Sequence, residues 1–281
     1  MSKKKLTFEY CDNLVQEFEK VIERPIVGQS STYYTGVDLG TACVVLAVLD
    51  ENYKPVAGAY RYADVVRDGM VVDYIGAIKI VRELKQEIEE KLNTELLYAA
   101  AAIPPGTDSL DSGAIKNVVQ AAGFELTCLL DEPTAANEVL KIQNGAVVDI
   151  GGGTTGISIL KDGKVVYVAD EPTGGTHFSL VVSGAYGMPI KDADKFKRDD
   201  KNHKELLPVL KPVVEKVASI INQHIKSHHV EELYLVGGTC CLAGIEEIIE
   251  KQTGIYTHKP KNPMFVTPLG IALSCTQEIM E

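Results

Sequence analysis

The sequence lacks the features that mark membrane proteins, secreted proteins and zinc or redox motifs. No apolar run is long enough to cross a bilayer, which excludes a membrane-spanning helix. The segment Lys3-Lys4-Lys5 is followed by no apolar signal core. The six cysteines form no C-x-x-C pair, so we expect reduced and mostly buried thiols. These absences predict a cytoplasmic protein.

Positive charge is scarce as well. The chain has 28 lysines and arginines against 39 aspartates and glutamates, for a net charge of −11. This balance argues against non-specific binding to nucleic acid or to an anionic membrane. The 281 residues suffice for two linked domains with hydrophobic cores, and strand-like runs alternate with helical patterns in the α/β manner.

Glycine is concentrated in residues 146–160, the most informative stretch of the chain. An apolar run ends at Asp149, a glycine and threonine segment (residues 151–156) follows, and a β-branched run begins at Ile157. This order predicts a strand, a tight turn and a second strand. Glycines let a phosphate approach backbone N–H groups, and a carboxylate at the strand end can hold hydrated magnesium. The stretch therefore suits a nucleoside triphosphate with magnesium.

Two other interpretations of the same glycines stay open. Residues 151–156 satisfy the G-x-G-x-x-G fingerprint of dinucleotide-binding domains. That fingerprint requires a helix after the glycines, whereas a β-branched strand and a turn at residues 161–164 follow here. The fingerprint is therefore disfavoured, and a glycine-rich hairpin without a ligand is the remaining alternative.

A second hairpin with the same order of residue types lies near the start of the chain. A short strand ends at Asp38, Gly40, Thr41 and Ala42 form the turn, and another apolar strand follows. Two such hairpins predict two related lobes, each contributing a carboxylate and a loop to one central ligand.

Five motifs in order resemble those of the actin, sugar kinase and heat-shock chaperone ATPase superfamily. The two hairpins resemble its phosphate loops, and residues 131–137 and 268–272 resemble the starts of its connecting helices. Residues 233–239 resemble its adenosine-binding strand and turn. The resemblance implies an α/β fold of two actin-like (ribonuclease H-like) lobes with a nucleotide cleft between them.

The resemblance also implies a division into domains. Residues 31–144 plus 263–281 would form actin-like domain I, and residues 145–262 would form domain II. Residues 1–30 would be an N-terminal amphipathic helical extension, since apolar side chains recur at helical spacing over residues 6–23. This helix either packs on the core or docks a partner.

Site residues follow from the resemblance as well. Asp38 and Asp149 would bind magnesium through water, and Asp149 with Glu132 would orient the attacking water, which makes these three the candidate catalytic residues. The candidate contacts to ATP or ADP are Gly40, Thr41, Ala42, Gly151, Gly152, Gly153, Thr154, Thr155, Gly174, Gly175, Asp194, Lys197, Arg198, Gly237, Gly238 and Thr239.

Several of these residues have simpler explanations. Glu132 would favour a helix N-terminus in any protein, with Pro133 at the first helical position. Residues 192–198 would also suit a solvated charged helix, and residues 174–176 a plain loop. His224 and His228 have the spacing of a zinc pair, but no carboxylate or third ligand accompanies them at the right spacing in the sequence, so metal binding there is not expected.

The chain departs from the chaperone pattern at two positions. Gly156 stands where chaperones have an acid that helps to hold the metal shell, and Cys241 stands where they have an adenine-stacking arginine. We therefore expect nucleotide binding with slow magnesium-dependent ATP hydrolysis, or binding without turnover.

Residues 63–69, 104–108 and 154–156 further resemble the chaperone-like members of this superfamily that serve ethanolamine utilisation. The resemblance implies an ATPase that couples nucleotide-dependent lobe closure to a protein partner, either an ammonia-lyase subunit or a component of a bacterial microcompartment. Association with a microcompartment would then accompany the cytoplasmic location. The alternatives are a non-hydrolysing nucleotide-gated adaptor, an actin-like filament protein and a small-molecule kinase.

Overall fold

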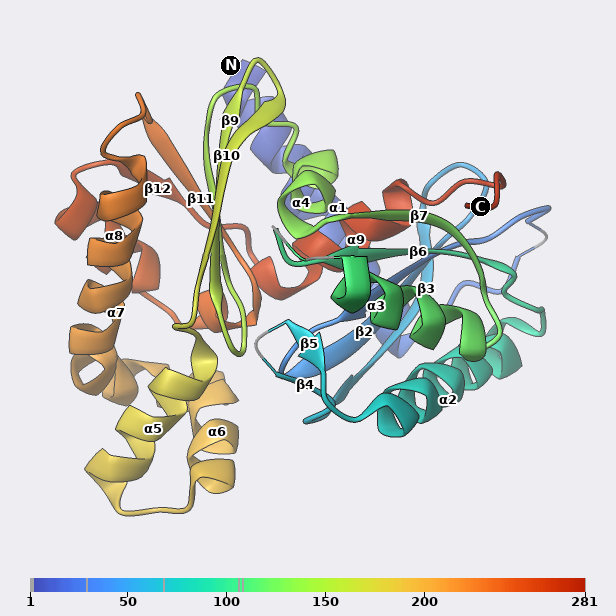
Figure 1. The fold of residues 1–281 in the computed structure, drawn as a ribbon, viewed down its shortest axis with the longest axis horizontal. Coiled ribbons are helices and arrows are strands. Elements are labelled where there is room, and N and C mark those ends of the chain that lie inside the picture. Colours follow the sequence, from blue (N-terminus) through green and yellow to red (C-terminus); the bar gives the residue numbers. More distant parts are fainter. Residues whose placement is uncertain (1–2, 29, 68, 106, 108, 281) are drawn as a thin grey trace. The chain divides into compact units, whose positions relative to one another are not determined.

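A computed structural model describes the chain except for residues 1–2, 29, 68, 106, 108 and 281 and the side chains of residues 3–7 and 109–111 (Figure 1). Asp68, Gly106 and Asp108, which belong to two of the motifs above, thus lie outside the described residues. The chain divides into two compact units. Unit 1 is Met1–Lys141 with Phe265–Glu281, and unit 2 is Ile142–Met264.

Unit 1 contains a five-stranded mixed sheet in the order β3-β2-β1-β6-β7. The first three strands form an antiparallel meander, and the last two run parallel to β1. The strands are β1 (Tyr34–Leu39), β2 (Cys43–Leu49), β3 (Pro55–Tyr62), β6 (Tyr98–Ile103) and β7 (Glu125–Asp131), and a small separate hairpin comprises β4 (Val66–Arg67) and β5 (Met70–Val71).

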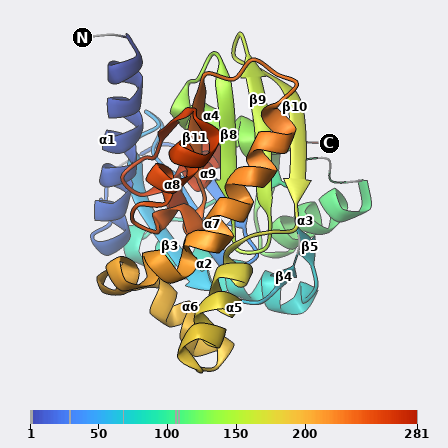
Figure 2. The same ribbon diagram turned by 90° about the vertical axis from the view of Figure 1, so that its left-hand side faces the viewer.

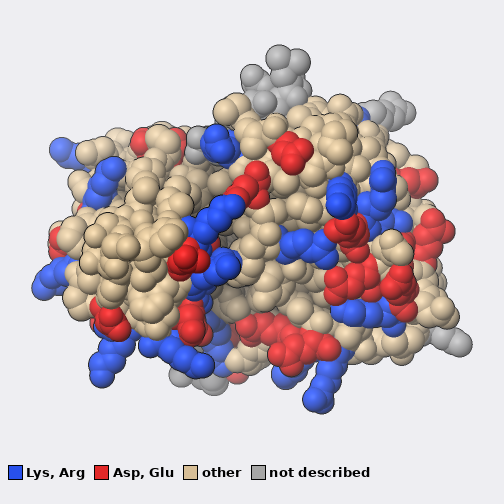
Figure 3. All heavy atoms as spheres, turned by 90° about the horizontal axis from the view of Figure 1, so that it is seen from below, with Lys and Arg blue, Asp and Glu red and all other residues tan. Residues whose placement is uncertain are grey.

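Helices cover both faces of this sheet. Helices α2 (Tyr74–Leu92) and α3 (Ser109–Ala121) bury apolar residues such as Leu84 against one face. On the outer side of α2, acidic and basic side chains are mixed, with Lys91 bonded to Glu87 (Figure 3).

Helices α1 (Lys3–Glu23) and α9 (Val266–Leu273) pack on the other face, and α4 (Glu132–Leu140) packs on α9. Glycines permit these close contacts. A Cβ at Gly36 of β1 would lie 2.5 Å from the backbone of α9, and a Cβ at Gly58 of β3 would lie 2.5 Å from the ring of Phe18 in α1. The N-terminal helix is therefore packed on the sheet of unit 1 through a buried aromatic ring.

Unit 2 repeats the strand plan of unit 1. Its sheet has the order β10-β9-β8-β11-β12, with three antiparallel strands followed by two parallel ones. The strands are β8 (Gly145–Ile150), β9 (Thr155–Lys161), β10 (Lys164–Glu171), β11 (Glu232–Val236) and β12 (Tyr256–His258). The prediction of two related α/β lobes is thus confirmed.

The helices of unit 2 share a second core with its sheet: α7 and α8 contact the strands, α5 packs on α7, and α6 packs on α5. They are α5 (Gly175–Tyr186), α6 (Ile190–Arg198), α7 (His203–Ile225) and α8 (Ile245–Thr253), together with the short 3-10 turns η1 (Asp200–Asn202), η2 (Gly238–Cys241) and η3 (Pro263–Phe265), the last of which ends in unit 1. Figure 2 shows α7 lying across the strands. None of the helices in the described part of the chain is long and apolar enough to cross a membrane.

One interpretation of residues 174–176 was wrong. A plain loop was the alternative to a segment near the nucleotide, but α5 begins at Gly175. Residues 172–190 contain no charged side chain, so the sequence carries no alternation of apolar and charged residues to indicate this helix. The short elements α8 and β12 were not predicted either.

Candidate functional site

The β8–β9 hairpin has the predicted strand, turn and strand. Asp149 pairs with Gly156 and Ile150 with Thr155 across the hairpin. Within the turn, the N–H of Gly151 donates to the carbonyl of Thr154 at 3.0 Å. Asp149 thus lies one residue before the end of β8, and Ile150 separates it from the glycines.

The start of α5 braces this turn from one side. The N–H groups of Gly175 and Thr176 donate to the carbonyls of Gly151 and Gly152 at 2.9 and 2.8 Å. The Thr176 hydroxyl donates to the same Gly152 carbonyl at 3.0 Å. A Cβ at Gly174 would lie 2.7 Å from the Gly153 carbonyl carbon, so only glycine permits this approach.

The bracing sets the direction of the neighbouring donors. In a trans peptide the N–H points opposite to the C=O of the same peptide group. Because the carbonyls of Gly151 and Gly152 point toward α5, the N–H groups of Gly152 and Gly153 point away from it. The turn therefore directs two successive backbone donors to its side away from α5, and donors in such an arrangement can bind an anion.

Two residues after β11 also contact the glycine turn and Asp149. The Thr239 hydroxyl donates to the Gly151 carbonyl at 2.7 Å. Gly237 has φ +91°, and a Cβ there would overlap the carboxylate of Asp149. Gly237 and Thr239 were both expected to contact a nucleotide, and in the structure they position Asp149 and the glycine turn.

Thr155 differs in a similar way from its expected role. Its side chain is fully buried, and its hydroxyl donates to the carbonyl of Thr173. This hydroxyl joins β9 to the segment that leads into α5. We therefore assign Thr155 to the support of the turn and leave it out of the proposed phosphate contacts.

A charged cluster on α6 is joined to the same assembly. The Lys197 ammonium donates to the Gly175 carbonyl at 2.8 Å and to the Ser179 hydroxyl at 2.9 Å. It also pairs with Asp194 at 3.1 Å, and Arg198 pairs with Asp194 at 3.0 Å. Only 12% of the Lys197 side chain is exposed, so a fully solvated charged helix is the wrong description of α6.

Burial and pairing shift the pKa values in this cluster. Burial lowers the pKa of Lys197, and the nearby carboxylate of Asp194 offsets only part of that effect. Burial alone would raise the pKa of Asp194, but the charges of Lys197 and Arg198 outweigh it and hold this pKa below its usual value. Asp194 is therefore ionised at neutral pH.

In unit 1, the predicted residues lie at one edge of the sheet. Asp38 lies one residue before the end of β1, and a Cβ at Gly40 would lie 2.9 Å from the Cys43 carbonyl oxygen, so the turn of residues 40–42 is tight. Strands β1, β6 and β7 are parallel, so their carboxyl ends share this edge, and Glu132 begins α4 directly after β7.

The cap of α4 was missed. Asp131 accepts from the N–H of Thr134 at 3.0 Å and from its hydroxyl at 2.8 Å, which makes it the N-cap residue. Glu132 is the first helical residue, so Pro133 stands second and not first as expected. An acid three residues before a threonine amide was the signal available in the sequence.

The histidine pair is engaged in other contacts. His224 Nδ1 lies 2.7 Å from the Tyr167 hydroxyl, and His224 Nε2 lies 2.8 Å from a Glu171 oxygen. The His228 ring lies 4.8 Å from the Tyr167 ring. Glu171, which is 53 residues from His224 in the sequence, thus places a carboxylate beside the pair, but both nitrogens of His224 are occupied. Among the residues that the structure describes, no group of three or more His, Cys, Asp or Glu could hold a metal ion.

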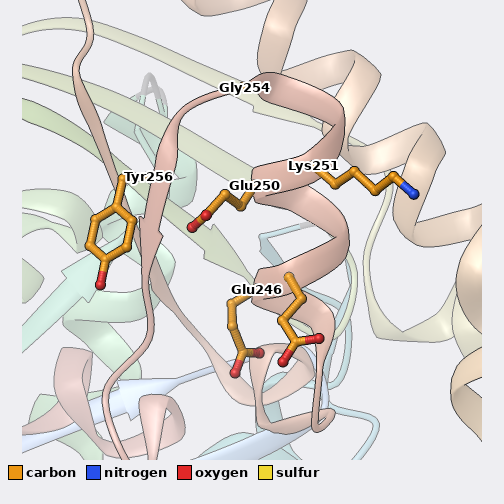
Figure 4. Close-up of a pocket in the computed structure, with 6 residues that line it drawn as sticks. Glu246, Glu250, Lys251, Gly254 and Tyr256 are labelled. Atoms are coloured by element: carbon orange, nitrogen blue, oxygen red, sulfur yellow. The ribbon is translucent and has the colours of Figure 1, made fainter.

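A hollow of about 610 Å³ lies elsewhere in unit 2, beside α8 and β12 (Figure 4). Its acidic lining includes Glu246, which pairs with Lys259, and Glu250, which accepts from the Thr257 N–H at 3.0 Å. An acidic lining repels phosphate, and none of the predicted site residues belongs to it. We therefore do not assign the hollow to a nucleotide.

Two family models match parts of the chain. The model of the Type IV pilus assembly protein PilM matches residues 132–265, and the model of the MreB/Mbl protein matches residues 56–183. Both matches include the glycine turn of residues 151–154.

Similar proteins cover nearly the whole chain. Ethanolamine utilization protein EutJ of Salmonella typhimurium is 46% identical over 86% of this chain and 85% of that protein. The crystal structure of EutJ from Carboxydothermus hydrogenoformans has a TM-score of 0.91 and 47% identity, and covers 95% of this chain and 99% of that chain.

A more distant structure carries the same fold. MreB5 of Spiroplasma citri, bound to ADP, has a TM-score of 0.68 and 18% identity, and covers 86% of this chain and 96% of that chain. The fold is therefore the actin-like ATPase fold, as the motifs predicted.

Proposed function

Because the chain belongs to the EutJ family of ethanolamine utilization proteins, we propose that it binds ATP or ADP with magnesium and passes the state of the nucleotide to a protein partner. The observation that carries the proposal is the braced glycine turn of unit 2. Its carbonyls are tied back to α5 and Thr239, so its N–H groups are aimed at an incoming phosphate. A related fold in MreB5 holds ADP, which supports the proposal.

The groups around the turn fit a nucleotide phosphate. In this proposal Gly152 and Gly153 donate N–H groups to the phosphates, and Thr154 adds a donor beside them. From unit 1, the turn of Gly40, Thr41 and Ala42 contributes in the same way. Main-chain donors fixed in advance stabilise phosphate charge without reorganising when the ligand arrives.

The carboxylate of Asp149 fits hydrated magnesium, because Gly237 leaves room for it beside the turn. Asp38 would supply a second water-mediated contact from unit 1. Magnesium, when bound, would neutralise phosphate charge. Asp149 and Glu132 would orient the water that attacks the terminal phosphate, and Glu132 is already placed at the start of α4.

The adenosine end would lie toward α6 and the turn after β11. Asp194, Lys197 and Arg198 form an ordered cluster there, and Gly238 leaves open space, with only Met264 within 4 Å of an added Cβ. Gly174 and Gly175 would form the wall between this region and the phosphates.

Turnover is expected to be slow. Gly156 offers no carboxylate of its own next to Asp149, which removes one group that could hold the metal shell. We propose that nucleotide state changes the closure of the lobes and thereby the affinity for a partner in ethanolamine catabolism. An ammonia-lyase subunit or a microcompartment component would be that partner, and the protein would work in the cytoplasm or at a microcompartment.

The test is phosphate release from magnesium ATP by the full chain, together with the melting temperature in ADP. We expect slow turnover in the wild type, none in Asp149→Ala, and a rise of melting temperature with nucleotide. Glu247→Gln removes a carboxylate in the distant hollow and should behave like the wild type.

Other outcomes distinguish the alternatives. Stabilisation without turnover would favour a nucleotide-gated adaptor, pelleting that depends on ATP would favour a filament, and phosphate transfer to an alcohol would favour a kinase. Absence of both turnover and stabilisation would contradict nucleotide binding.

A further inference from the structure

A second carboxylate lies beside Gly156, on the neighbouring strand. Asp170 of β10 pairs with Gly156 of β9, which in turn pairs with Asp149 of β8. The three residues thus form one row across three adjacent strands. Residues in register on neighbouring strands project to the same face of a sheet.

The central position of this row has no side chain. A Cβ built at Gly156 would lie 3.8 Å from Asp170 Oδ1 and 3.9 Å from the Cβ of Asp149. The two residues therefore flank one gap from opposite sides, Asp170 with a carboxylate oxygen and Asp149 with its Cβ, while an Asp149 carboxylate oxygen lies beside Gly237. The apolar neighbours Val148 and Ile157 face the core of unit 2, so the row faces away from it.

The row also adjoins the braced turn. Asp149 and Gly156 are the residues next to Ile150 and Thr155, the last pair of the hairpin before the turn. Asp170 lies three residues before Thr173, whose carbonyl accepts from Thr155. Both carboxylates are thus attached to the same hydrogen-bonded framework that aims the turn.

We propose that Asp170 positions magnesium in the nucleotide site, opposite Asp149 and across Gly156. This inference rests on the proposed function and adds a residue to that site. Strands two places apart are separated by roughly 10 Å, which suits an ion that keeps its water. Magnesium dehydrates reluctantly and is commonly bound through one or two carboxylates together with phosphates.

The missing acid at Gly156 is therefore replaced from the next strand. An acid on β9 and an acid on β10 can reach the same gap. A Cβ at Gly156 would lie at ordinary van der Waals distances from its neighbours, so a side chain can be introduced there. A swap of the acid between the two strands is thus a direct test.

The test compares the affinity of the full chain for the ATP analogue AMPPNP in magnesium and in EDTA, by titration calorimetry. Asp170→Asn should lower the ratio of the two affinities about 10-fold or more, as loss of an outer-shell partner does at metal sites. Binding in EDTA should be unchanged or slightly tighter, because one negative charge near the phosphates is gone. A merely structural role would weaken binding in both solutions.

Two further variants sharpen the test. Asp162→Asn makes the same substitution at the opposite end of the β9–β10 hairpin, where φ of +51° suits Asn, and should keep the wild-type ratio. Gly156→Asp in the Asp170→Asn background should restore a large part of the magnesium effect.

An unchanged ratio in folded Asp170→Asn would overturn this inference while leaving the proposed function intact. Failure of the wild type to bind AMPPNP in either solution would overturn both.

Discussion

The two units share a strand plan but differ in how their hairpin turns are supported. In unit 2, the glycine turn receives hydrogen bonds from α5 and from Thr239. In unit 1, the turn of residues 40–42 is tight at Gly40, and its Ala42 carbonyl accepts from the Ala63 N–H at 3.2 Å. The turn of unit 2 is thus held by more neighbouring segments, so in the proposed site it would be the main phosphate loop and unit 1 would contribute mainly its carboxylates.

The largest effect is expected from Gly237→Ala. The new Cβ would require a positive φ and would overlap the Asp149 carboxylate, so we expect a loss of about 3 kcal/mol in the free energy of unfolding. Nucleotide affinity should fall as well. Denaturant titration and calorimetry measure the two effects.

Gly254→Ala is the matched control for that substitution. Gly254 also has a positive φ, of +71°, but nothing lies within 4 Å of an added Cβ. We expect a loss of only about 1 kcal/mol and unchanged nucleotide affinity. Equal losses in the free energy of unfolding of the two variants would show that the contact with the Asp149 carboxylate does not affect stability.

A smaller effect is expected from Thr239→Val, which removes the hydroxyl that holds the Gly151 carbonyl. Stability should fall by about 1 kcal/mol, and affinity for magnesium ADP should fall too because the turn is less well fixed. Thr257→Val removes a similarly buried hydroxyl in β12, bonded to Ile255, and should cost stability alone. An unchanged ADP affinity in Thr239→Val would argue against a pre-fixed turn.

The smallest effect concerns the pH dependence of the α6 cluster. The pKa of Asp194 is lower in the folded chain than its ordinary value of 3.8, so its contribution to stability is fully present above that value. The contribution is lost as the pH falls through the lowered pKa. Asp194→Asn should therefore be less stable than the wild type at pH 7, and the gap should close in acid.

Unfolding curves of both proteins between pH 7 and strongly acidic solution would measure this gap. Since more than a third of the Asp194 side chain is exposed, solvent screens the pair and the gap will be modest. A gap that does not change with pH would mean that the lost interaction is not ionic.

The sequence predicted both hairpins and the N-terminal helix well, because their patterns are local. The acid, glycine and threonine order defined both turns, and apolar spacing defined α1. Helix α5 was missed because its surroundings carry no charge, and a glycine pair at its start suggests a loop. Short elements such as β12 give too few residues for a periodic signal.

Parts of the candidate site could not be predicted from local patterns in the sequence. The supporting roles of Gly237 and Thr155 depend on which backbone atoms lie next to them in the folded chain. The pairing of Asp170 with Gly156 depends on strand register, which includes an irregularity between Val165 and Tyr167. A register that shifts at such a point cannot be counted from the sequence alone. The nucleotide cleft between the lobes stays a prediction.

The most direct test of the central claim is amide hydrogen exchange of the full chain with and without magnesium ADP. We predict slower exchange in peptides that contain Gly152 and Gly153, because their N–H groups would be bonded to phosphate. Peptides from α8, beside the acidic hollow, should not change. Protection that appears elsewhere while the glycine turn exchanges as before would contradict the assignment of this turn as the phosphate loop.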